Sequence, residues 1–136
     1  MTKTNRLLSI LTLLLACSLF TATSRAGEYG ALAVGISLGY PAQVSAGYAL
    51  DHETPWDADK LALERCNNAG PAKCRIVSAF SGRGECGFIS IGKGYPRQGG
   101  VGWGMGTTPR VALANCRLRV PLCEVPIGGC IQDARE

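Results

Sequence analysis

The 136-residue chain has one histidine and no Cys-x-x-Cys pair. Six of its seven cysteines follow residue 65, and their separations of 8, 12, 30, 7 and 7 residues do not match the closely paired ligands of structural zinc sites. The chain also has no phosphate-binding glycine loop, because no Lys-Ser or Lys-Thr follows the Gly-rich segment 99–106. We therefore expect neither a metal nor another cofactor.

After residue 26 the sequence has no apolar run that approaches the roughly 20 residues of a membrane-spanning helix. Residues 1–26 have a basic start, the run LLSILTLLLACSLF, and small residues at Ser24 and Ala26, which is typical of a secretory signal peptide cleaved after Ala26. The alternative is a lipid anchor at Cys17, because LLAC resembles the box in which bacterial lipoproteins are acylated. Both interpretations predict a periplasmic or secreted protein.

The mature chain carries little excess charge. Removal of residues 1–26 leaves 11 of the 14 basic residues against 10 acidic ones, so the formal net charge falls from +4 to +1, and nucleic-acid binding is not expected. Charge is nevertheless segregated, with a net −4 over residues 28–69 and a net +7 over residues 70–123. This asymmetry either steers a charged partner, such as an acidic protein, onto one face or attracts the two halves to each other.

Two stretches of the chain resemble each other. Residues 39–50 read GYPAQVSAGYAL and residues 94–105 read GYPRQGGVGWGM, with five of twelve positions identical, including Gly47 with Gly102. Further on, Thr54-Pro and Thr108-Pro each predict the start of an Ala-rich helix, because Thr caps a helix and Pro suits its first position. We interpret the two halves, 29–80 and 86–130, as a duplicated unit.

Each half predicts strand, turn, strand, helix, strand. The last strand is strong at CRIVSAF (74–80) and weak at CEVPI (123–127), where Pro126 interrupts it and Cys130 lies beyond it in a loose terminus. The expected fold is α+β, mainly antiparallel, either as two small sheets or as one larger sheet with two helices.

Six cysteines in an exported chain indicate three disulfides. Cys66 with Cys74 and Cys116 with Cys123 occupy equivalent helix-to-strand connections, which leaves Cys86 to pair with Cys130. We expect a single disulfide-stabilised domain over residues 27–131 and a flexible C-terminus at 132–136.

The segment GGVGWGMG (99–106) alternates glycine with larger residues and so predicts a strand with one almost bare face. Close packing of a helix or another strand against this face is the simpler explanation. The functional alternative is a shallow groove for a ligand.

The GYP turn, the strand GWGMGTT, the Ala-rich helix ending at Cys116 and the segment NNAGPAKCRIV together resemble a bacterial secreted domain of unknown function, the DUF4189 family. The resemblance covers about residues 29 to 130. It implies a small exported domain held by disulfides, and no catalytic signature accompanies it.

His52, between Asp51 and Glu53, is the one candidate catalytic residue, although three polar residues before a helix are more often a solvated loop. Candidate binding residues are Tyr95, Arg97, Trp103 and Arg110. The leading hypothesis is a non-enzymatic, exported protein-binding module of the bacterial cell envelope, resembling an immunity protein, an inhibitor or a secretion accessory. The alternative is a small secreted effector or hydrolase acting on cell-envelope polymers through His52.

Overall fold

A computed structural model describes residues 27–39, 41–95 and 99–132 of the chain. The first half forms β1 (Tyr29–Ser37), β2 (Gln43–His52), α2 (Pro55–Asn68) and β3 (Cys74–Ser81). The second half forms β4 (Cys86–Lys93), β5 (Val101–Gly106), α3 (Pro109–Arg117), β6 (Leu122–Cys123) and β7 (Ile127–Cys130). The predicted α+β class is confirmed, and in the described residues neither helix is long and apolar enough to cross a membrane.

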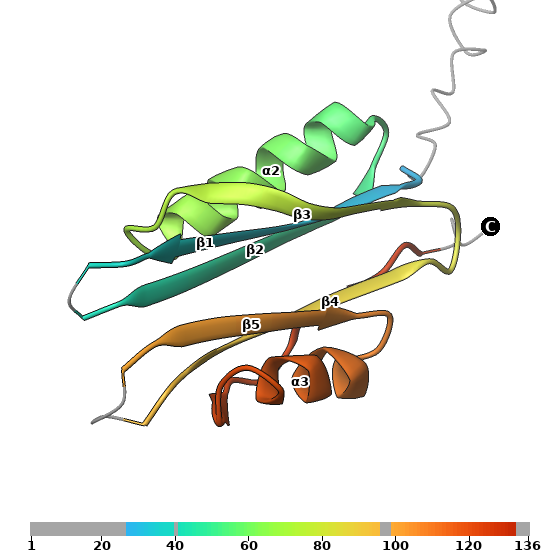
Figure 1. Cartoon of the computed structure of the whole chain (residues 1–136). Coiled ribbons are helices and arrows are strands. Elements are labelled where there is room, and N and C mark those ends of the chain that lie inside the picture. Colours follow the sequence, from blue (N-terminus) through green and yellow to red (C-terminus); the bar gives the residue numbers. More distant parts are fainter. Residues whose placement is uncertain (1–26, 40, 96–98, 133–136) are drawn as a thin grey trace, which may run out of the picture.

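The strands form two antiparallel sheets, which decides between the two arrangements left open by the sequence. The first sheet has the order β2-β1-β3, and the second has the order β5-β4-β6, with β7 also paired to β4. Figure 1 shows α2 covering the outer side of the first sheet and α3 covering the outer side of the second. The layers therefore run helix, sheet, sheet, helix, and the two halves share one connectivity. A duplication as the origin of this likeness stays an interpretation.

Two different apolar layers hold the first sheet, because residues alternate between the faces of a strand. On the side of α2 the buried residues are small: Ala31, Ala33, Ala49, Ala58, Ala62 and Cys66. Between the two sheets they are larger and come from both halves: Leu32, Val34, Ala46 and Ile89, with Phe80 and Trp103 packed against them. This second cluster joins the halves.

The bare face of β5 lies against α3. A Cβ atom at Gly104 would lie 2.8 Å from the carbonyl oxygen of Ala112 and would also meet the backbone nitrogen of Cys116. One at Gly106 would lie 2.7 Å from Cβ of Val111. The close approach of a helix is thus the correct explanation of the alternating glycines, and the proposed ligand groove on that face is wrong because α3 fills it.

The structure aligns the residues of the two halves differently from the alignment that the two GYP motifs give. Gly47 pairs with Ala33 and its missing side chain faces Ala62 and Cys66 of α2. Gly104, not Gly102, has the corresponding place, since it faces the equivalent residues of α3. The sequence alignment is therefore wrong by two residues in this strand. A shift of two keeps every side chain on the same face, so the apolar pattern could not reveal the error.

The helix starts are as predicted. The Thr54 hydroxyl accepts a hydrogen bond from the backbone N–H of Asp57, and the Thr108 hydroxyl accepts one from Val111. Such caps satisfy backbone donors that a helix leaves unpaired in its first turn.

The C-terminal strand differs from its prediction. Instead of one strand at 123–127, the chain forms β6 and then β7, so Cys130 lies inside a strand and opposite Cys86. Ile127 pairs with Ile89, while the N–H of Glu124 donates to the carbonyl of Ile91, so two residues, Val125 and Pro126, lie opposite the single residue Ser90. Proline is accepted at such a bulge because it has no N–H to contribute to the ladder.

The three disulfides are Cys66–Cys74, Cys116–Cys123 and Cys86–Cys130, the pairs expected from the sequence. Each of the first two fastens a helix to the strand that follows it. The third fastens β7 to the start of β4. Cys66 and Cys116 are fully buried, whereas Cys130 is exposed.

Candidate binding surface

The catalytic candidate His52 ends β2 and is half-buried. Within the described residues its side chain has no hydrogen bond or ion pair. Its neighbour Asp51 has a left-handed backbone with φ of 60°, and its carboxylate accepts a hydrogen bond from the N–H of Gln132 at 2.8 Å. The Asp51 carboxylate thus binds the C-terminal segment and forms no hydrogen bond with the imidazole of His52. The described residues also contain no group of three His, Cys, Asp or Glu side chains that could hold a metal ion.

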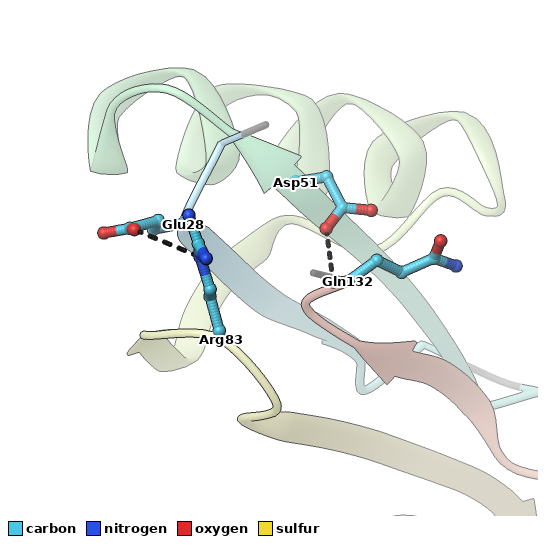
Figure 2. Close-up of polar contacts among 4 residues, drawn as sticks. All are labelled: Glu28, Asp51, Arg83 and Gln132. Carbon is cyan, nitrogen blue, oxygen red and sulfur yellow. Dashed lines mark hydrogen bonds and ion pairs between the residues drawn. The ribbon is translucent and has the colours of Figure 1, made fainter. Parts of the chain in front are cut away.

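Figure 2 shows that the surroundings of Asp51 are a structural junction. Nε of Arg83, in the turn between β3 and β4, lies 3.8 Å from Oε1 of Glu28, just before β1. The backbone N–H of Gly82 donates to the carbonyl of Glu28, and the N–H of Ile131 donates to that of Glu85. These contacts tie both ends of the described chain to the turn that connects the two sheets.

The four candidate binding residues do not form one cluster. Trp103 lies on the face of β5 that is turned toward the first sheet, between glycines whose bare side meets α3. Arg110 is exposed in the first turn of α3, on the other side of that strand. Tyr95 is 53 % exposed beyond the end of β4, and Arg97 lies outside the described residues.

A small cleft of about 190 Å³ lies between the sheets at the end remote from the junction of Figure 2. Its lining comes from four segments, namely β1, the loop before β3, the start of β3, and β5. The lining residues are Val34, Ile36, Lys73, Arg75 and Trp103. An aromatic ring and two aliphatic side chains thus form its walls together with two cations.

Local structure explains why Arg75 reaches this cleft. Cys74 and Ile76, on either side of it, both pack in the cluster next to α2. Because neighbouring side chains in a strand point to opposite faces, Arg75 points to the side of the second sheet. The register changes at Val77, two residues further on, because Ser78 pairs with Leu32 and Ile76 with the next residue, Ala33. The bulge that places Arg75 here cannot be read from the sequence.

A third cation lies next to the cleft. The guanidinium carbon of Arg119 is 5.1 Å from the centre of the Trp103 ring, a cation–π contact. Lys73, Arg75 and Arg119 are all exposed, and none forms an ion pair with another described residue. Their positive charge is therefore available to a ligand.

The sequence analysis selected Trp103 but missed the residues around it. The alternation of glycines already indicated that Trp103 faces away from the helix. Nothing in the local sequence indicates that Ile36, Lys73 and Arg75, from the other half of the chain, lie opposite it.

The acidic and basic segments form few ion pairs with each other among the described residues. Among the described residues, one ion pair, Glu28 with Arg83, joins the acidic segment to the basic one, and both side chains are more than half exposed. Exposed ion pairs stabilise a protein little. This ion pair therefore adds little to the attraction between the halves.

Comparison with known proteins gives a family and nothing closer. Searches of the curated proteins and of the solved structures found no match to this chain. A sequence model described as "Domain of unknown function (DUF4189)" matches residues 29–126, from the first residue of β1 to the bulge before β7. Because the match spans most of both halves, the chain belongs to the DUF4189 family.

Proposed function

We propose that this protein is an exported, non-enzymatic binding module that recognises an acidic protein in the cell envelope or outside the cell. The observation that carries the proposal is the cleft between the sheets, where three cations without an ion-pair partner among the described residues surround Trp103. Aromatic residues and arginine at the centre of a contact, with polar residues around them, are characteristic of the residues that dominate protein–protein binding energy.

Export is supported by the disulfides and by the leader. Three disulfides are typical of a secreted or extracellular protein. The tripartite sequence of residues 1–26 favours cleavage after Ala26 and a periplasmic or secreted destination. An immunity protein, an inhibitor of a secreted toxin or an accessory of a secretion system would each use such a module.

Binding is favoured over hydrolysis because the chemistry for hydrolysis is not assembled. All six cysteines of the described chain are in disulfides, so none supplies a thiol nucleophile. His52 has no hydrogen-bonded partner to orient it among the described residues, whereas a general base in nucleophilic catalysis is held by one.

Co-purification from the native host tests this function. Tagged protein is recovered with its partners by mild crosslinking, as wild type and as the variants Arg75→Glu and His52→Ala. We expect one acidic protein to accompany the wild type and His52→Ala and to be lost with Arg75→Glu, whose fold is checked by circular dichroism. A polymer-cleaving activity that His52→Ala abolishes would overturn the proposal in favour of the hydrolase.

A further inference from the structure

We infer that the cleft accommodates a short acidic peptide segment of the partner, with a carboxylate between Lys73 and Arg75 and a neighbouring aliphatic side chain on Trp103 and Ile36. This inference rests on the proposed function and assigns the site and the ligand chemistry to it.

The positive charge of the cleft favours an anionic ligand. Lys73 and Arg75 are the two polar side chains in the lining, both are cationic, and Arg119 adds a third positive charge at Trp103. Among the described residues, none that lines the cleft is acidic and would compete for them. Guanidinium groups bind carboxylates through two parallel hydrogen bonds, so a Glu or Asp side chain matches the site.

The size and shape of the cleft favour side chains of a larger partner over a free small molecule or an oligosaccharide. The cleft is smaller than the roughly 300–1,000 Å³ pockets that enclose drug-sized ligands. Its walls are Val34, Ile36 and Trp103, of which Ile36 is 40 % exposed and so offers apolar surface for contact. An oligosaccharide needs many hydrogen-bonding partners along its length, whereas the polar side chains among the described lining residues are the two cations. An aliphatic residue next to an acidic one uses both kinds of surface.

The chain offers a direct optical test. It has two tryptophans, and Trp56 is 74 % exposed on α2, on the outer side of the first sheet. The variant Trp56→Phe therefore leaves Trp103 as the single indole fluorophore. This disulfide-intact mature protein is titrated with the peptide Glu-Leu-Glu-Glu-Leu-Glu and with a twin in which every Glu is Gln.

We expect a saturable change in Trp103 emission with the acidic peptide and none with the Gln twin. Arg75→Glu should weaken the binding at least tenfold, because it places a like charge beside the carboxylate. Arg110→Glu makes the same change of charge on the far side of β5 and is the matched control. It should leave the affinity within about twofold, and a rise from 50 to 500 mM salt should weaken binding to the parent protein.

Three results would overturn the inference. One is the absence of a saturable change with the acidic peptide. Another is equal weakening by Arg75→Glu and Arg110→Glu, which would mean that only overall charge matters. The last is a response to an oligogalacturonate without a response to the peptide, which would assign the site to an acidic polysaccharide. Arg75→Gln, which removes the charge without adding an opposite one, serves as the second variant if Arg75→Glu does not fold.

The outcomes separate this inference from the proposed function. If the peptide fails to bind but an acidic partner still co-purifies in an Arg75-dependent manner, only the assignment to a short segment is wrong. If the peptide binds as expected but no partner accompanies the protein in its host, the peptide site is confirmed and the proposed role in the envelope is wrong.

Discussion

Gly47 and Gly104 allow each helix to lie directly against the backbone of an edge strand. Neither position has room for a Cβ atom, because main-chain atoms of the helix occupy the space. One side chain from each helix adds a hydrogen bond to this contact. The Arg65 guanidinium donates to the carbonyl of Tyr48, and the Asn115 amide donates to that of Met105, both at 2.8 Å. Side chains from the two helices thus cover backbone acceptors on β2 and β5, the kind of unpaired edge that otherwise invites aggregation.

At this scale we predict that Gly104→Ala destabilises the protein. The added methyl group would collide with the backbone of α3 near Ala112 and Cys116, so the helix must move away from β5. Overpacking of this kind costs about 1–3 kcal/mol, and the midpoint of urea unfolding should fall accordingly. Gly39→Ala is the control, since its new Cβ would have no neighbour closer than 3.7 Å. Equal midpoints for the two variants would contradict the packing described for α3.

Each helix forms a unit with the strands around it. A disulfide closes each unit within a short loop, with separations of 8 residues for Cys66–Cys74 and 7 for Cys116–Cys123. The third disulfide spans 44 residues and holds β7 against β4. In the chain-entropy description a longer closed loop stabilises more, so this bond should contribute about 4 kcal/mol and the short ones about 2.5 kcal/mol each.

We predict that mild reductant opens Cys86–Cys130 before the other two bonds. Cys130 is exposed and Cys86 half-buried, whereas each of the other bonds includes a fully buried sulfur, from Cys66 or Cys116. Stepwise alkylation followed by peptide mass mapping gives the order, and unfolding of the partly reduced form gives the loss of stability. First labelling at Cys66 or Cys74 would show that exposure does not control reduction here.

The sequence allowed most elements to be predicted, because their signals are local. Thr-Pro marks both helix starts, alternating glycines mark β5, and the six cysteines after residue 65 mark the disulfides. The errors arose where structure depends on long-range pairing. The strand register could slip by two residues unnoticed, and the placement of Cys130 in β7 depends on pairing with Cys86. The cleft could not be predicted for the same reason, since Arg75 and Trp103 belong to different sheets.

At the scale of the whole molecule, the beginning of the described chain is part of the fold. Gly27 is buried, and a Cβ atom there would meet the backbone of Asp51 and His52. The segment after β7 reaches the same region through the hydrogen bond between Gln132 and Asp51. The expected cleavage after Ala26 would therefore leave a mature chain whose first residue is already packed.

We predict that protein recovered from the envelope or the medium begins at Gly27. Intact-mass measurement checks this, because removal of residues 1–26 and formation of three disulfides give one defined mass. A diacylated species beginning at Cys17 would show that the lipid-anchor alternative is the correct one.

None of the three disulfides joins one sheet to the other. The covalent link between the sheets is the turn from Ser81 to Cys86, and the polar contacts of Figure 2 reinforce that end. The cleft lies at the opposite end, where the described residues of the two sheets meet through side-chain packing. The two sheets are therefore joined covalently at one end only, and a partner that enters the cleft meets two sheets that no disulfide holds together.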